Sequence, residues 1–159
     1  MNSEEPLSYD QITDHLYIGA RPQPGDWFEL AALGITVDID LQVEGQDRFY
    51  KNVPDVYLWL PTPDWYGPNS LTLMTATHFI RMMIAQDRIV YVHCSMGVGR
   101  SPAVAAAFLV TLGMTVSAAV AMVKAKRPKA KLNATQIEHL EEFAAQWKGQ
   151  EAKKEGPSG

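Results

Sequence analysis

Cys94 and Arg100 are the residues whose types and spacing best suit covalent chemistry on phosphorus. They lie in the stretch VYVHCSMGVGRSP, residues 90–102, with five residues between them, and Cys94 is the only cysteine of the chain. A thiolate is a strong nucleophile, and the planar fork of a guanidinium holds two phosphoryl oxygens at once, which a lysine cannot do. The spacing therefore predicts a nucleophile and a charge clamp around one phosphorus atom.

The residues between Cys94 and Arg100 form a loop suited to an anion. A short apolar run from about Ile89 predicts a buried strand, and Ser-Pro before an Ala/Val-rich run predicts a helix start. Gly97 and Gly99 can adopt a positive φ, so the loop can aim its N–H groups at one point beside the positive helix end. A buried structural cysteine beside a turn would explain neither the glycines nor the arginine. The predicted phosphate-binding residues are Ser95, Met96, Gly97, Val98, Gly99 and Arg100.

The stretch resembles the phosphate loop of the cysteine-dependent protein tyrosine phosphatase superfamily. The runs LYIGARPQ, residues 16–23, and LAALGITVDIDLQVE, residues 30–44, resemble the amino-terminal half of its dual-specificity branch, and the likeness extends from about Tyr9 to Trp147. It implies a three-layer α/β fold and phosphatase activity through a phosphocysteine. The fixed positions of the family loop are matched by His93, Cys94, Gly97, Arg100 and Ser101.

Asp64 is the predicted general acid. It lies thirty residues before Cys94, in the segment LPTPDWYGPNS that leaves the carboxyl end of a predicted strand, the edge where ligand sites form in open α/β sheets. This segment resembles the loop that carries the general acid in dual-specificity phosphatases. Asp55 is the rival, but it precedes the strand and so belongs to its other end. A purely structural turn residue is the alternative for Asp64.

The resemblance implies roles for the remaining site residues. Ser101 would donate a hydrogen bond to the departing thiolate, and it would also cap the helix before Pro102. His93 would brace the loop, with a buried core histidine as the alternative. Receptor-like members position the hydrolytic water with a late glutamine, and the nearest match by eye falls at Leu132-Asn133, with Gln136 shortly after. Water positioning therefore stays open, with Asn133 as a candidate.

The periodicity predicts strands alternating with helices, hence one three-layer α/β domain with a mainly parallel central sheet flanked by helices. A hairpin turns at Asp14-His15, strands cover 35–41 and 56–60, Ser70 caps a helix, and Asn133 with Gln136 caps the last one. The phosphatase domain would span 9–148, between a flexible N-terminus, 1–8, and a disordered polar tail, 149–159.

Composition limits partners and compartment. The chain has 159 residues and a net charge of −4, which argues against general nucleic-acid binding. A lone cysteine agrees with a reducing compartment and leaves no resolving thiol. The acidic N-terminus lacks the layout of a signal peptide, and no apolar run is long enough for a membrane span. We therefore expect a cytoplasmic protein.

No metal or other cofactor is expected. Asp38 and Asp40 share one face of a strand, but no histidine or further carboxylate stands at ligand spacing, which favours a structural role. A basic run covers residues 124–131. A solvated helix end is the preferred interpretation of this run over a docking patch for an acidic partner.

The expected substrate is a phosphorylated protein or peptide carrying phosphotyrosine, with phosphoserine and phosphothreonine as further targets. No Lys or Arg lies between Cys94 and Arg100, whereas related lipid phosphatases often carry basic residues there. Trp65 and Tyr66 would flank a phosphotyrosine ring. The alternatives are a phosphoglucan, because Val98-Gly99 resembles the loop of glucan phosphatases, a phosphoinositide, or a non-catalytic phosphate-binding role. The sequence leaves the oligomeric state open.

Overall fold

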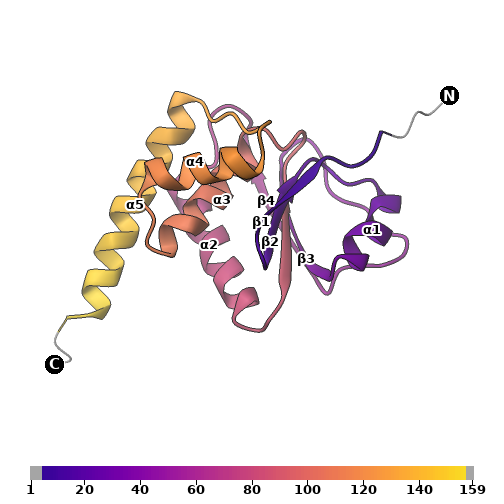
Figure 1. Cartoon of the computed structure of the whole chain (residues 1–159), viewed down its shortest axis with the longest axis horizontal. Coiled ribbons are helices and arrows are strands. Elements are labelled where there is room, and N and C mark those ends of the chain that lie inside the picture. The colour runs from indigo at the N-terminus through magenta and orange to yellow at the C-terminus, as the bar shows by residue number, and fades with distance from the viewer. Residues whose placement is uncertain (1–4, 157–159) are drawn as a thin grey trace.

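The structure, a computed structural model, describes residues 5–156, and a five-stranded sheet runs through it (Figure 1). The strands are β1 (Tyr9–Thr13), β2 (Leu16–Gly19), β3 (Ile35–Gln42), β4 (Val56–Thr62) and β5 (Ile89–His93), in the order β1-β2-β5-β3-β4. Only the β1–β2 hairpin is antiparallel. The mainly parallel sheet is as predicted, and β5, which leads into the predicted phosphate-binding loop (residues 94–99), lies at its centre.

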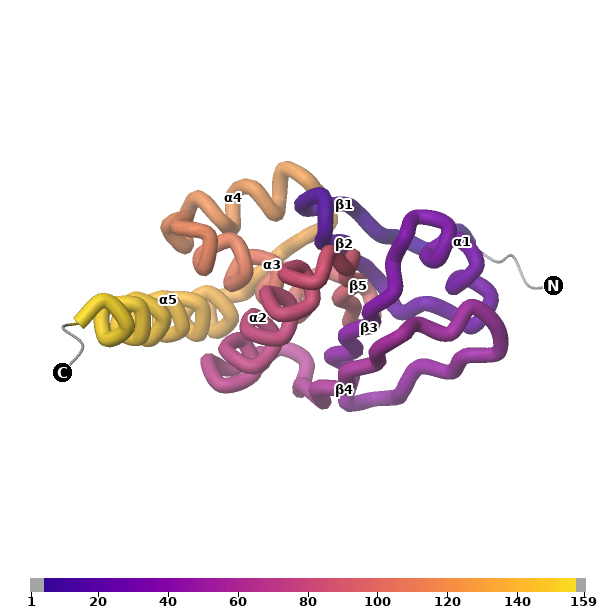
Figure 2. Tube along the Cα trace, turned by 90° about the horizontal axis from the view of Figure 1, so that it is seen from below, coloured from indigo at the N-terminus to yellow at the C-terminus, as the bar shows by residue number. Residues whose placement is uncertain are grey.

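Helices cover both faces of the sheet (Figure 2). A 3-10 turn (Pro24–Asp26) and α1 (Trp27–Ala32) lie on one face, and the other face carries α2 (Ser70–Ile84), α3 (Arg100–Thr111), α4 (Val116–Lys126) and α5 (Ala134–Lys154). The domain has two hydrophobic cores, one on each face of the sheet, and successive side chains of β5 point to opposite faces. Val90 and Val92 belong to the larger core, and Tyr91 packs with Trp27 and Leu30 of α1 in the smaller one. The three-layer α/β architecture is confirmed.

Helix α3 lies among the sheet, α2, α4 and α5, and it is buried from Arg100 to Val110. Its run of alanines allows neighbours to pack closely on every side. Because β5 leads into the predicted phosphate-binding loop and α3 follows it, two buried elements fix both ends of the loop.

Two boundaries differ from the prediction near the acid loop. Strand β4 continues to Thr62 through Pro61, which is tolerated because β4 is an edge strand. The cap of α2 is Asn69, whose side chain accepts from Thr72 N, so the prediction of Ser70 as the cap was wrong by one residue. The acid loop is therefore the short segment 63–69.

The two ends of the domain also differ from expectation. The disordered tail predicted from 149 is wrong for its first part, because α5 continues to Lys154 through good helix formers; residues 157–159 lie outside the described part. Of the N-terminal segment 1–8, residues 1–4 lie outside it as well. Ser8 is anchored, since its carbonyl accepts from Ala20 N at 2.9 Å.

The basic run is only partly solvated. Lys124, Lys126, Lys129 and Lys131 are exposed, but Arg127 is fully buried, so the expectation of a solvated helix end is wrong for that residue. Within residues 5–156, none of the helices is both long and apolar enough to cross a membrane.

Candidate active site

Cys94 lies at the base of a cavity of about 420 Å³ at the carboxyl edge of the sheet, with 3% of its surface exposed. Gly97 N–H donates to its Sγ at 3.2 Å, and Ser101 Oγ lies 3.6 Å from the same sulfur. A backbone N–H and a hydroxyl thus both lie against the sulfur. The cavity is lined by the predicted residues Asp64, Cys94, Ser95, Met96, Val98, Gly99 and Arg100, and also by Glu44, Trp65, Lys131, Leu132, Asn133 and Gln136.

The two glycines of the loop serve different purposes. Gly97 has a φ of 70°, and a Cβ there would lie 2.5 Å from the carbonyl carbon of Gly19. Gly99 has a negative φ of −125°, so the positive φ that the sequence suggested occurs only at Gly97. Gly99 is required by close approach instead, because its Cβ would lie 2.8 Å from Gln136 Nε2.

Arg100 is held so that one edge of its guanidinium faces the cavity. Its Nη1 donates to Glu44 Oε1 and to the Thr62 carbonyl, both at 2.9 Å, and Nη2 donates to Glu44 Oε2 at 3.3 Å. Its Nε is buried without a hydrogen-bond partner anywhere in residues 5–156. Burial alone would raise the pKa of Glu44, but the hydrogen bond and charge of Arg100 lower it, so Glu44 is an anion that fixes the arginine.

Asp64 also lines the cavity, beside the Nε of Arg100. Its Oδ1 is 3.7 Å from Arg100 Nε and accepts from Trp65 N at 3.0 Å. This contact is to the next residue and not to the N–H two residues on, so it is not the Asx-turn kept as the alternative, and the same carboxylate lies beside the Arg100 guanidinium. The rival Asp55 pairs with Arg88 at 2.7 Å and does not line the cavity. The acid role of Asp64 stays a prediction with suitable geometry.

Asn133 and Gln136 anchor the acid loop. Asn133 Nδ2 donates to the Trp65 carbonyl at 2.9 Å, and its Oδ1 accepts from Gln136 N as the predicted capping box. Gln136 Nε2 donates to the Gly67 carbonyl at 3.2 Å. The two amide nitrogens thus hold the loop, while the two side-chain oxygens form the capping box, and the residue that positions the hydrolytic water stays unassigned.

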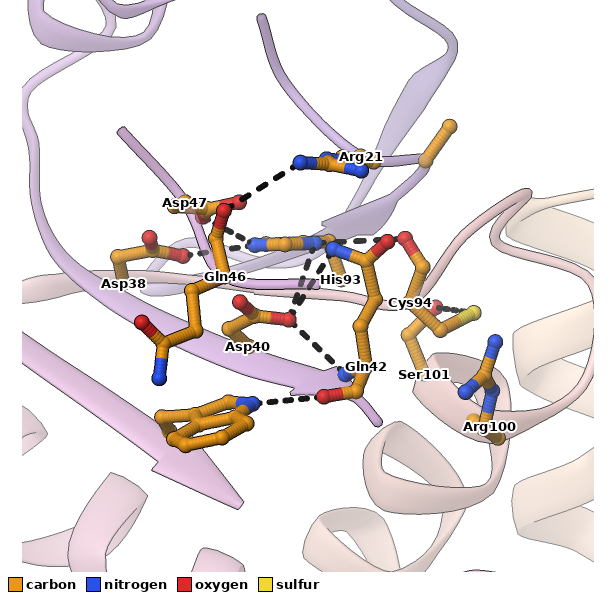
Figure 3. Close-up of polar contacts among 12 residues, drawn as sticks. Arg21, Asp38, Asp40, Gln42, Gln46, Asp47, His93, Cys94, Arg100 and Ser101 are labelled. Carbon is orange, nitrogen blue, oxygen red and sulfur yellow. Dashed lines mark hydrogen bonds and ion pairs between the residues drawn. The ribbon is translucent and has the colours of Figure 1, made fainter. Parts of the chain in front are cut away.

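The His93 ring contacts the start of the predicted phosphate-binding loop, at Cys94 (Figure 3). Its Nδ1 is 3.3 Å from the Cys94 carbonyl, and its Nε2 lies 2.5 Å from Asp47 Oδ2 and 3.2 Å from Asp38 Oδ1. Burial alone would lower its pKa, but hydrogen bonds to Asp38 and Asp47 raise it to about 10. His93 is therefore a cation that donates from both ring nitrogens, which suits a brace rather than a proton carrier.

The acids around His93 take different charge states. Burial raises the pKa of Asp38 well above its usual range. Burial also opposes ionisation of Asp47, but hydrogen bonds from His93 and Asp38 lower its pKa. The network therefore holds one neutral carboxyl, one carboxylate and one imidazolium. Asp40 completes it by accepting from the Tyr57 hydroxyl at 2.7 Å.

A histidine does approach the predicted acid pair, contrary to the sequence expectation. Ligand atoms of Asp38, Asp47 and His93 gather within 4.8 Å of one another. The 2.5 Å from His93 Nε2 to Asp47 Oδ2 is a hydrogen bond, whereas two ligands of one metal ion, each about 2 Å from it, lie farther apart. The arrangement fits an ion-paired brace, which is the structural role the sequence predicted for Asp38 and Asp40.

Ser101 is brought to the sulfur by the first turn of α3. Its Oγ lies 3.3 Å from the Gly19 carbonyl as well as 3.6 Å from Cys94 Sγ. The predicted capping role is wrong, because α3 begins at Arg100 with Gly99 as its cap. The hydroxyl is free of the helix end, and it donates to the Gly19 carbonyl while lying within reach of Cys94 Sγ.

Sequence reasoning missed three residues that touch this machinery: Glu44, Asp47 and Arg127. Glu44 and Asp47 lie in an irregular polar segment whose path no periodicity indicates. Arg127 is hidden in a run of lysines. The one signal for a buried role was the residue type, because arginine, unlike the lysines around it, can donate to several oxygen acceptors at once.

Comparisons with known proteins agree with this geometry. A family described as "Dual specificity phosphatase, catalytic domain" matches residues 16–146. Phosphatidylglycerophosphate phosphatase PTPMT2 of Arabidopsis thaliana is 32% identical over 142 residues, covering 86% of this chain and 62% of that protein. Human dual specificity protein phosphatase 9 is 32% identical over 119 residues, covering 74% of this chain and 31% of that protein. This chain thus spans less than two thirds of either relative.

Among solved structures, that of PTPMT1 superposes with a TM-score of 0.82 at 24% sequence identity. It covers 92% of this chain and 99% of the other. At this identity the likeness establishes the fold alone.

Proposed function

This chain belongs to the dual specificity phosphatase family and is a cysteine-based phosphatase, and we propose that it hydrolyses phosphate monoesters through a phosphocysteine on Cys94. One observation carries the proposal. The buried sulfur, with Gly97 N–H at 3.2 Å, shares its cavity with Arg100, whose buried Nε has no hydrogen-bond partner among residues 5–156 and only the Asp64 carboxylate near it, at 3.7 Å. A buried donor left unpaired is costly unless an acceptor such as a phosphoryl oxygen fills the cavity.

The proposed cycle has two displacements. Cys94 thiolate attacks phosphorus, the bond to the ester oxygen breaks, and Asp64 donates its proton to that oxygen. Arg100 and the loop N–H groups hold the phosphoryl oxygens. Water then attacks the phosphocysteine while ionised Asp64 accepts its proton. Phosphate leaves, and Ser101 donates a hydrogen bond to the released thiolate.

The test is hydrolysis of p-nitrophenyl phosphate in the presence of a metal chelator. We expect turnover by the native chain, none by Cys94→Ser, and a fall of about 10²-fold or more in kcat for Asp64→Asn. After an acid quench, mass spectrometry of the native chain is expected to find one phosphoryl group on the peptide that carries Cys94. Turnover by Cys94→Ser equal to that of the native chain would refute the proposal.

For the substrate, we propose a glycerophospholipid phosphate monoester, the class to which the substrate of the Arabidopsis relative belongs. The cavity rim supports this choice, because Trp65 and Met96 are each 71% exposed and Leu132 lies beside them. An exposed apolar rim suits a substrate with an apolar part. Lys131 on the same rim offers a cation to a second anionic group such as a phosphodiester.

Phosphotyrosine in a protein is the second candidate, with phosphoserine and phosphothreonine after it. It is favoured by the exposed indole of Trp65 beside Asp64 and by the absence of Lys and Arg from residues 95–99. The deep position of Cys94 also suits a long aryl ester better than a short alkyl one.

A substrate panel separates the two candidates: phosphatidylglycerophosphate in mixed micelles, a phosphotyrosyl peptide, a phosphoinositide and a phosphoglucan. We expect the highest kcat/KM for phosphatidylglycerophosphate. Lys131→Met is expected to lower that value about tenfold while leaving p-nitrophenyl phosphate hydrolysis unchanged. A higher kcat/KM for the phosphotyrosyl peptide, unaffected by Lys131→Met, would replace the lipid with the protein substrate.

A further inference from the structure

Arg127 is a fully buried arginine at the end of α4 whose guanidinium reaches the catalytic loop. Its Nε donates to the Gly97 carbonyl at 2.6 Å, and its Nη2 donates to the Met96 carbonyl at 3.2 Å. On its other side, Nη1 pairs with Asp10 Oδ2 at 2.9 Å, and Nη2 donates to Ser8 Oγ at 3.1 Å. One side chain thus ties two consecutive loop carbonyls to the start of β1.

Burying such a charge is unfavourable unless it is paired and its donors are used. Arg127 satisfies both conditions, with a carboxylate on one side and two carbonyls on the other. Lys126, the preceding residue, is exposed. The burial is therefore specific to Arg127 within the basic run.

The two carbonyls determine where the loop N–H groups point. In a trans peptide the C=O and N–H bonds point in opposite directions. The Met96 carbonyl belongs to the same peptide group as Gly97 N–H, and that N–H donates to Cys94 Sγ at 3.2 Å. The Gly97 carbonyl likewise belongs to the peptide group of Val98 N–H. Drawing both carbonyls toward Arg127 turns both N–H groups away from it, and the Gly97 N–H then points at the sulfur.

The contact also leaves no room for another arrangement. A Cβ on Gly97 would lie 2.6 Å from Arg127 Nη2, so loop backbone and guanidinium are packed against each other. Rotation of either peptide group would remove an acceptor from a buried cation.

We propose that Arg127 is a positioning residue, which orients the Gly97 and Val98 N–H groups that stabilise the thiolate and the bound phosphoryl group. Asp10 holds the guanidinium in place. The proposal rests on the proposed phosphatase function, since it assigns Arg127 to the same reaction. It acts through the backbone of the loop and does not touch the substrate.

The test compares Arg127→Lys with Lys126→Met. An ammonium retains the charge, but a single nitrogen cannot serve Asp10, Met96 and Gly97 together. For Arg127→Lys we expect kcat/KM for p-nitrophenyl phosphate to fall about 30-fold or more and competitive inhibition by inorganic phosphate to weaken about tenfold. The pH midpoint of Cys94 alkylation by iodoacetamide is expected to rise by about one unit. Lys126→Met is expected to match the native chain in all three.

Circular dichroism and thermal melting establish whether the variant is folded. A folded Arg127→Lys with the native alkylation midpoint and native phosphate inhibition overturns the proposal. If Arg127→Lys fails to fold, Asp10→Asn provides the test, because it releases one side of the guanidinium. A rise in the pH midpoint of Cys94 alkylation in Asp10→Asn supports the proposal, and an unchanged midpoint overturns it.

Alkylation does not require turnover, so the two proposals fail separately. The native chain could lack phosphatase activity while Arg127→Lys still raises the pH midpoint of Cys94 alkylation. That result would contradict the proposed function and support the orienting role of Arg127.

Discussion

Asn133 Nδ2 donates a hydrogen bond to the Trp65 carbonyl at 2.9 Å, joining the first turn of α5 to the residue that follows the predicted acid, Asp64. Gln136 makes a parallel contact to Gly67 two residues farther along the loop. The capping box of α5 is therefore also the anchor of the acid loop. Helix capping and the position of the predicted acid are coupled through one side chain.

Asn133→Ala is expected to lower kcat about tenfold for phenyl phosphate and much less for p-nitrophenyl phosphate. The reason is that a displaced Asp64 matters most when the leaving oxygen is basic and needs a proton. Loss of the cap is also expected to reduce the free energy of unfolding by about 1 kcal/mol. Steady-state kinetics with the two esters and urea denaturation provide the measurements.

Thr115→Ala is the matched control, because Thr115 caps α4 by accepting from Ala118 N and does not line the cavity. It is expected to lose similar stability with kcat unchanged for both esters. Equal losses of kcat for the two esters in Asn133→Ala would contradict the anchoring role.

The sequence was sufficient for the parts of the site that follow one another along the chain. The strand before Cys94, the loop glycines and the helix after Arg100 all lie within residues 89–111, where local patterning is strong. Asp64 could be placed from its position after a strand, since parallel strands end at the same edge of a sheet.

Contacts between distant segments could not be read in this way. Glu44 reaches Arg100, and Asp47 reaches His93, from an irregular segment without periodicity. Arg127 was misassigned because burial of a charge depends on partners in β1 and in the loop, which no local pattern reveals. The disorder predicted from residue 149 was wrong as far as Lys154 for a simpler reason: a polar segment rich in Glu, Ala and Lys continues a helix that has already begun.

Ser101→Ala is expected to slow the second displacement selectively. Ser101 Oγ lies 3.6 Å from Cys94 Sγ, where it can donate to the thiolate that forms when phosphocysteine is hydrolysed. Loss of one such donor is expected to reduce kcat by about 10²-fold and to leave the first step nearly unchanged. Stopped-flow kinetics would then record a burst of p-nitrophenol equal to the enzyme concentration. A burst-free trace with equal loss in both steps would argue against this role.

His93 is expected to make the stability of the domain fall at alkaline pH. Its pKa is raised from 6.5 to about 10 in the folded chain, so between these values the folded state keeps a proton that the unfolded state releases. The stabilisation is fully present below pH 6.5 and is lost as the pH approaches 10. The free energy of unfolding should therefore decrease by up to about 1.4 kcal/mol per pH unit in this window.

Urea denaturation of the native chain and of His93→Asn at about pH 6, 7, 8 and 9 tests this expectation. The amide of the variant cannot titrate, so the free energies of unfolding of the two chains should converge as the pH rises. His93 lowers the pKa of the buried Asp38 through its hydrogen bond and charge, so the difference between the two chains reports the coupled titration of His93 and its acidic partners. A constant difference across the series would mean that His93 is neutral in the folded state.

Gly97→Ala and Gly99→Ala are expected to differ in severity although only two positions separate them. At Gly97 the φ of 70° is unfavourable for alanine, and the new Cβ would lie 2.5 Å from the backbone of Gly19, which cannot move without disturbing β2. The expected loss is about 3 kcal/mol or more, together with loss of the anion site.

At Gly99 the φ of −125° is accessible to alanine, and the contact at 2.8 Å is with the end of the Gln136 side chain. That side chain can yield by giving up its bond to Gly67, which is expected to cost about 1 kcal/mol. The catalytic effect should then resemble that of Asn133→Ala, with phenyl phosphate affected more than p-nitrophenyl phosphate. Urea denaturation measures the loss of stability, and kinetics with the two esters measure the catalytic effect. Equal destabilisation by the two alanines would show that the positive φ of Gly97 contributes nothing to the cost of the substitution.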